Sequence, residues 1–127
     1  MKVTKFTVEN DILIAPDLAV GLPCMIGQGG ATVGTDGVKV IKAGTPLYGS
    51  ADVKTNRKTV LSATATGTCQ GLARHDVYFY NNETYINDTV LTQGIVNLDL
   101  IDNAVVAKIT SDVKSALPLI QFVKGDA

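Results

Sequence analysis

The chain has no tryptophan, one histidine and two cysteines among its 127 residues, and only 6% of the residues are aromatic. Charged residues are also few, at 18%, and 11 basic against 12 acidic residues leave a formal net charge of −1. A protein that binds nucleic acid through phosphate contacts usually has a basic surplus or a basic cluster. The densest basic run, residues 54–58 (KTNRK), is too short for that role, so we interpret it as a solvated loop and expect no direct binding to nucleic acid.

No apolar run approaches the ~20 residues that cross a bilayer. The first ten residues, MKVTKFTVEN, also lack the apolar stretch of about 7–15 residues that a secretion signal contains. We therefore expect a protein that is made in a cytoplasm and does not contact a membrane. Cys24 and Cys69 form neither a CxxC motif nor a zinc-site spacing. The sequence leaves a disulfide between them open, but two buried free thiols agree better with a cytoplasmic protein.

Few residues suggest chemistry. His75 stands beside Asp76, but no nucleophile motif such as GxSxG accompanies the pair, and one histidine with one carboxylate falls short of a metal site. The glycine cluster at residues 27–30 (GQGG) precedes a strand-like ATVG rather than a helix, so it predicts a turn and not a phosphate loop. We expect no catalytic residue, no metal and no cofactor, and hence no enzyme.

The residue pattern predicts a mainly β protein. Its length suits one domain of about 100–150 residues, and glycine, threonine, valine and isoleucine recur between turn signals. We expect strands at residues 38–41, 68–80, 89–98 and 119–123. Gly44 should take a positive φ in the turn before Pro46, and Gly94 should mark a bulge. One short C-terminal helix should begin at Ser111 or Asp112 and end before Pro118.

The N-terminal residues form a separate hypothesis. Thr4, Phe6 and Val8 alternate with less distinct neighbours, a period-2 pattern of weak hydrophobic contrast. Such a segment pairs as a strand only where another protein offers an edge. We therefore divide the chain into an N-terminal arm, residues 1–15, that can be mobile, and a single β-rich domain, residues 16–127.

Four aromatic residues gather in one stretch: Tyr78, Phe79, Tyr80 and Tyr85. They suit a platform on which a sugar or a base could stack. Packing in a core and across a hairpin also explains them. The sequence leaves both readings open and favours the packing one.

Three motifs and a C-terminal pattern occur in a definite order: AGTPL at residues 43–47, GLARHDV at 71–77, GIVNLD at 94–99, and a short helix before LIQFV at 119–123. Together they resemble the head decoration proteins of tailed bacteriophages, of the type that caps the lambda capsid. The resemblance covers residues 38–123. The longer glycine-rich segment before Val38 departs from the lambda type.

The resemblance implies a small protein of β-barrel or β-tulip type that forms a homotrimer. It implies binding to the phage major capsid protein at three-fold or quasi-three-fold sites of the expanded capsid, on the outer surface of the virion, where it resists the pressure of packaged DNA. It also implies an N-terminal arm that binds the shell by adding a strand to elements of the coat protein. We therefore take Val3, Thr4, Phe6 and Val8 as candidate capsid contacts. The alternative is a carbohydrate- or receptor-binding β module of a phage tail or fibre, with the aromatic stretch as its site.

Overall fold

The structure is a computed structural model of the chain, and it describes residues 12–14, 19–34, 36–65, 67–81 and 83–124. The strands in these ranges are β1 (Leu13–Ile14), β2 (Val20–Gly27), β3 (Thr32–Val33), β4 (Lys39–Ile41), β5 (Pro46–Tyr48), β6 (Val60–Leu61), β7 (Cys69–Ala73), β8 (Val77–Phe79), β9 (Tyr85–Asn97) and β10 (Ile120–Val123). The helices are α2 (Asn103–Val106) and α3 (Ser111–Ala116), with a 3-10 turn at Leu98–Leu100. The predicted mainly β fold is confirmed.

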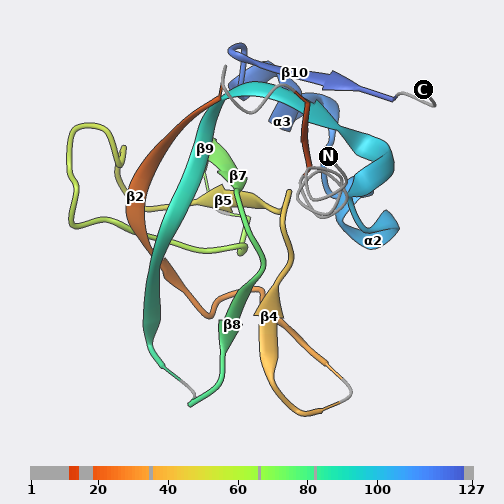
Figure 1. Cartoon of the computed structure of the whole chain (residues 1–127). Coiled ribbons are helices and arrows are strands. Elements are labelled where there is room, and N and C mark those ends of the chain that lie inside the picture. Colours follow the sequence, from red (N-terminus) through yellow and green to blue (C-terminus); the bar gives the residue numbers. More distant parts are fainter. Residues whose placement is uncertain (1–11, 15–18, 35, 66, 82, 125–127) are drawn as a thin grey trace, which may run out of the picture.

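Strand β9 is the centre of the larger sheet, in which the strand order is β5-β7-β9-β2-β6. Its first part pairs antiparallel with β2 on one side and with β7 on the other. Its last part pairs antiparallel with β1 and parallel with β10. A second sheet has three strands in the order β3-β4-β8. In Figure 1, β10 and both helices lie at one end of β9, and the β4–β8 pair lies toward the other.

Two clusters of buried side chains lie on opposite faces of the larger sheet. Adjacent residues Val90 and Leu91 of β9 belong to different clusters, because successive side chains of a strand point to opposite faces. The first cluster lies toward the helices and comprises Ile12, Leu13, Cys69, Leu72, Leu91, Val96, Ile101, Val105, Ile109, Val113, Leu117 and Ile120. The second lies toward the smaller sheet and comprises Cys24, Ile26, Ile41, Leu47, Val53, Leu61, Ala73, Val77, Phe79 and Val90.

The larger sheet stays open, which corrects the expected small barrel. Its two edge strands, β5 and β6, have three and two residues. Among the described residues a single bridge joins these edges, with N–O distances of 2.8 Å in both directions between Tyr48 and Ser62. Residues 49–59 between the two strands form turns and bends rather than a longer ladder, so one bridge is all that connects the edges.

Residues 68–80 are two strands and not the single strand expected. β7 ends at Ala73 and belongs to the larger sheet, whereas β8 begins at Val77 and belongs to the smaller one. The polar triplet between them turns the chain, and the Asp76 carboxylate accepts a hydrogen bond of 2.7 Å from the amide of Ala43. This contact fixes the change of direction at the turn that contains Gly44.

The C-terminal region has two short helices where one was expected. The predicted helix is α3, although its N-cap is Thr110, whose hydroxyl accepts from the amide of Val113. The additional helix, α2, is only four residues long. Its N-cap Asp102 accepts from the amide of Ala104 at 2.9 Å, and such a cap satisfies a donor that the first helical turn leaves free.

Gly44 has φ +91°, as predicted. The bulge expected at Gly94 occurs two residues earlier, because the β2–β9 register skips Thr92 between the pairs Val20–Gln93 and Gly21–Leu91.

Gly44→Val should destabilise the protein by about 3 kcal/mol. A side chain at this φ is strained, and a Cβ here would also lie 2.8 Å from Cδ1 of Ile101, in the first core cluster. Gly37→Val is the matched control, since Gly37 has φ +83° but no atom within 4 Å of such a Cβ. Urea unfolding of the three proteins measures the difference, and equal losses for the two variants would contradict a packing role for Gly44.

Candidate functional site

The N-terminal end of the described chain is fixed in the core. Ile12 and Leu13 are only 3% and 4% exposed, and the amide of Asn97 donates to the carbonyl oxygen of Ile12 at 2.8 Å. Leu13 and Ile14 pair with Val96 and Ile95 of β9. Leu13 and Ile14, near the end of the segment assigned to the arm, are therefore a strand of the sheet, with the buried Ile12 just before them. We call residues 12–14 the arm root.

An uncharged row of side chains lies beside the arm root. Ile14, Ile95 and Gln121 are opposite one another on β1, β9 and β10, and they face away from the first core cluster. Ile14 is 40% exposed, and Leu119, just before β10, is 63% exposed. We call Ile14, Ile95 and Gln121 the outer row. Charged residues are depleted at the centres of protein interfaces, so the row suits a contact surface.

The four candidate capsid contacts lie outside the described residues. Val3, Thr4, Phe6 and Val8 all belong to residues 1–11, directly before the arm root. Their role therefore stays a prediction. The structure adds the place on the sheet to which that segment is attached.

The aromatic stretch divides between core and surface. Phe79 is buried in the second cluster. Tyr78 and Tyr80 lie on the surface and stack on each other, with ring centroids 5.4 Å apart and planes at 19°. The Tyr78 hydroxyl donates to the Asp76 carboxylate at 3.4 Å, and the nearby negative charge of Asp76 raises the pKa of Tyr78. A stacking surface would therefore consist of this exposed pair, with Tyr80 67% exposed, and not of all four residues.

His75 does not pair with its sequence neighbour Asp76. Its Nδ1 lies 3.1 Å from Oδ1 of Asp88 on β9, and that oxygen also accepts from the amide of Thr89. The imidazole is exposed. In the part of the chain that the structure describes, no three His, Cys, Asp or Glu side chains gather as a metal site would require. The turn expected at residues 27–30 is present, with Gly30 at φ +77° before β3.

Both cysteines are free and buried, the state that the sequence favoured. Burial raises the pKa of Cys24 from 9.0 to about 11, and the nearby Asp88 carboxylate adds to the shift. Burial also raises the pKa of Cys69, whose thiol donates to the carbonyl oxygen of Gly71. Both thiols therefore stay protonated at neutral pH and are poor nucleophiles.

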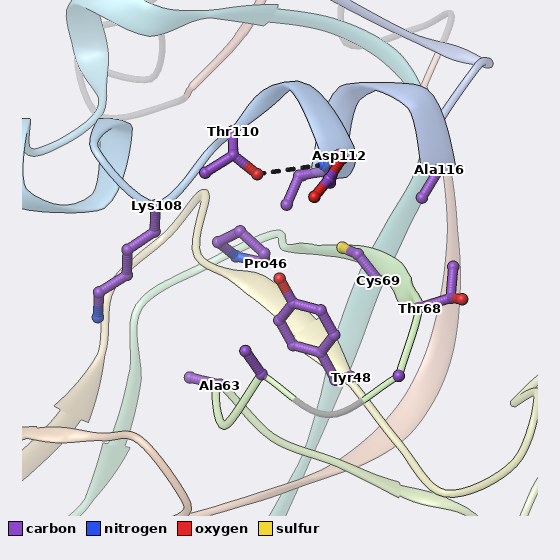
Figure 2. A pocket seen from close by; sticks show the side chains of 12 residues that line it. Pro46, Tyr48, Ala63, Thr68, Cys69, Lys108, Thr110, Asp112 and Ala116 are labelled. Atoms are coloured by element: carbon purple, nitrogen blue, oxygen red, sulfur yellow. Dashed lines mark hydrogen bonds between the residues drawn. The ribbon is translucent and has the colours of Figure 1, made fainter.

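A hollow of about 690 Å³ lies between α3 and the segment leading into β7. Its lining includes Tyr48, Ala65, Cys69, Lys108 and Asp112, which come from separate parts of the chain. Figure 2 shows the Tyr48 ring in the middle with its hydroxyl directed toward α3. Burial raises the pKa of Tyr48, and Cys69 and Asp112 add to the shift. The sequence does not predict this hollow, because no local pattern links these residues.

No helix in the described part of the chain is long and apolar enough to cross a membrane. A scan against protein-family models finds no match, and searches of curated proteins and of solved structures find no significant similarity either.

The Cys24 thiol should make the protein less stable at alkaline pH. Because the folded pKa of about 11 exceeds the ordinary 9.0, the contribution of the protonated thiol is fully present below about pH 9 and is lost as pH rises toward 11. Between pH 8.5 and 10.5 the wild type should lose about 1–2 kcal/mol more unfolding free energy than Cys24→Ala. Urea titrations at each pH measure this loss.

Cys24→Ser controls for the lost volume, since it has nearly the size of cysteine but does not titrate in this range. It should show the same flatter pH profile as Cys24→Ala. Parallel profiles for the wild type and both variants would show that Cys24 does not cause the alkaline loss.

Proposed function

We propose that this chain is a structural decoration protein of a phage capsid. In this role it binds the major capsid protein at three-fold or quasi-three-fold sites of the expanded lattice and stabilises the shell against internal DNA pressure. It acts on the outer surface of the virion after synthesis in the host cytoplasm. The proposal assigns no catalytic residue and no cofactor, and it treats the chain as a binding protein. The order of the AGTPL, GLARHDV and GIVNLD motifs supports it.

The observation that carries the proposal is the arm root beside the outer row. Ile12 and Leu13 hold the chain in the core, while Ile14, Ile95 and Gln121 offer an uncharged surface next to it. The preceding 11 residues would span at most about 36–40 Å if fully extended. A segment of that reach, anchored next to a contact surface, is suited to join the body of one protein to the surface of another.

The arm sequence fits strand addition to a partner. In that mode main-chain hydrogen bonds provide affinity, and one or two side chains provide the fit. Phe6 is the bulkiest apolar residue among the candidate contacts, so it is the best anchor. The attachment of the arm to an ordered strand limits where it can reach, which lowers the entropy cost of placing it on a lattice.

The proposal includes a homotrimer at the three-fold sites. Large apolar side chains remain exposed on the described surface, among them Val33 and Leu119, and a small domain gains stability by burying such side chains between copies. Light scattering coupled to size exclusion should give about 40 kDa at high concentration, three times the chain mass of 13.3 kDa. A protein that is monomeric when free should reach this stoichiometry on the shell. A stable dimer would contradict the trimer.

Deletion of residues 2–8 should leave folding intact and weaken binding to expanded, undecorated capsids by at least ~2 kcal/mol, roughly thirtyfold. Folding should persist because the deletion spares the arm root, and binding should weaken because Phe6 and the strand-forming backbone are lost. Phe6→Ala should reproduce part of the loss. Sedimentation of labelled protein with capsids measures the affinity.

A glycine–serine segment of equal length in place of residues 2–8 is the matched control. It preserves the spacing but removes the side chains, so it should bind as weakly as the deletion or nearly so. Thermal melts of all variants should coincide. Capsid binding that is equal for the full-length and deleted proteins would rule out a role for the arm.

The exposed Tyr78–Tyr80 stack favours one alternative, a carbohydrate- or receptor-binding module of a phage tail or fibre. Aromatic faces can stack on sugar rings, and the Asp76 carboxylate beside Tyr78 could accept from sugar hydroxyls. A glycan array and expanded capsids distinguish the two functions. Glycan binding that Tyr80→Ala abolishes, without any capsid binding, would favour the alternative.

A further inference from the structure

A second hollow, of about 470 Å³, lies next to the hollow beside α3. Gly67, Thr68, Cys69 and Ala116 line both hollows, and we call the two together the α3 groove. The first hollow alone has the volume of a typical ligand site, about 300–1,000 Å³. Two neighbouring hollows suit an elongated occupant better than a compact one.

The junction of the two hollows has small side chains. Gly67, Thr68 and Ala116 leave space for another main chain to approach closely. Ala65 and Gly67 are exposed and belong to no strand. The backbone along this wall is therefore accessible to an extended segment, which must place its own amides and carbonyl groups against polar partners.

Each hollow contains one cation and one carboxylate. Lys108 and Asp112 line the first, and Asp52 and Lys54 line the second. None of these four side chains forms an ion pair with another described residue. The Tyr48 hydroxyl in the first hollow likewise makes no hydrogen bond to a described residue. All four side chains are exposed, and the Asp52 carboxylate accepts from the amide of Lys54 at 2.9 Å. An uncharged occupant that covered them would desolvate their charges without pairing them, which is costly.

The presence of both charge signs in each hollow limits which class of molecule would bind there. Nucleic acid carries negative charge only, and a neutral sugar carries none, so neither would complement both signs in both hollows. A protein segment with acidic and basic side chains does. Residues i and i+2 of an extended segment face the same way, so one strand can present both signs to one surface.

We propose that the α3 groove binds an extended protein segment that carries both acidic and basic side chains. The identity of the partner rests on the proposed function, under which the major capsid protein supplies this segment. The groove is then a contact distinct from the N-terminal arm: the arm extends from this chain to the shell, and the groove receives a segment of the shell.

The first experiment does not depend on capsids. The probe is an array of random-sequence peptides of about eight residues, incubated with the full-length protein. Peptides with both an acidic and a basic residue should bind best, and Lys108→Glu should weaken their binding at least about tenfold. Lys58→Glu is the matched control, because Lys58 is exposed and lines neither hollow. Absence of any peptide whose binding depends on Lys108 would overturn the groove.

The second experiment identifies the source of the segment. A photo-cross-linking residue at Ala65, on the groove wall, is activated on expanded capsids, with Ala107 as the exposed control position outside the groove. Mass spectrometry should find a mixed-charge segment of the coat protein linked to position 65 and not to position 107. Equal products at both positions, or links only to another copy of this chain, would overturn the coat protein as the source.

The two experiments separate failure of the groove from failure of the proposed function. Wild-type protein that selects peptides through Lys108 but does not bind capsids would leave the groove standing and overturn decoration. Suppose instead that Lys108→Glu leaves capsid binding unchanged and the array gives no Lys108-dependent peptide. That result would overturn the groove and leave decoration standing.

Discussion

The pairing of β7 with β9 is the interaction on which the rest of the structure depends. Leu72 pairs with Leu91 and Ala73 pairs with Val90, and all four side chains are fully buried. Leu72 and Leu91 face the helices, whereas their sequence neighbours Ala73 and Val90 face the smaller sheet. These positions therefore hold both cores together. Gly71 permits the close approach, since a Cβ there would lie 2.4 Å from a methyl carbon of Val90 and 2.6 Å from the carbonyl oxygen of Leu91.

The change of partners along β9 separates the candidate functional features. Its first part lies between β2 and β7, and its last part lies between β1 and β10. The irregularity at Thr92 and the unusual backbone of Gly94, at φ +148°, stand at this change. A side chain at Gly94 would meet Ala19 and Leu13 at about 3.3–3.5 Å, so glycine keeps the arm root close to β9. The arm root and the outer row lie along the last part of β9, through its pairing with β1 and β10, and away from the Tyr78–Tyr80 pair at the smaller sheet.

Local signals in the sequence predicted the features that depend on one segment. The positive φ of Gly44, the helix at α3 and the last strand each follow from a turn residue, a cap or a short apolar run. The division of residues 68–80 between two sheets did not follow, because it depends on the contact of Asp76 with Ala43, 33 positions earlier. The open sheet depends in the same way on how few residues β5 and β6 can pair.

The candidate sites show the same division. The apolar run at residues 12–14 predicts a short strand, and β1 confirms it, but the division of the chain placed this strand in the arm and not in the core that buries Ile12 and Leu13. The α3 groove could not be predicted at all, because Tyr48, Lys108 and Asp112 meet only when β5 pairs with β7 and α3 packs against β7. The spacing of charged residues along the chain does not show that these three side chains are close in space. Only tertiary packing brings them together.

A mechanical role requires that the arm be held more firmly at its root than at its tip. Ile12 and Leu13 share one core cluster with Val113 and Leu117 of the C-terminal region, so a pull on the arm is resisted by the core and not only by surface contacts. Full burial of such a side chain contributes about 1.5–3 kcal/mol, so the two together contribute about 3–6 kcal/mol, in addition to the β1–β9 hydrogen bonds. An arm with Phe6 as its principal anchor has one such contribution at its tip. Under the proposed decoration role, the Phe6 anchor would therefore yield before the root, and the arm could detach and rebind without unfolding of the core.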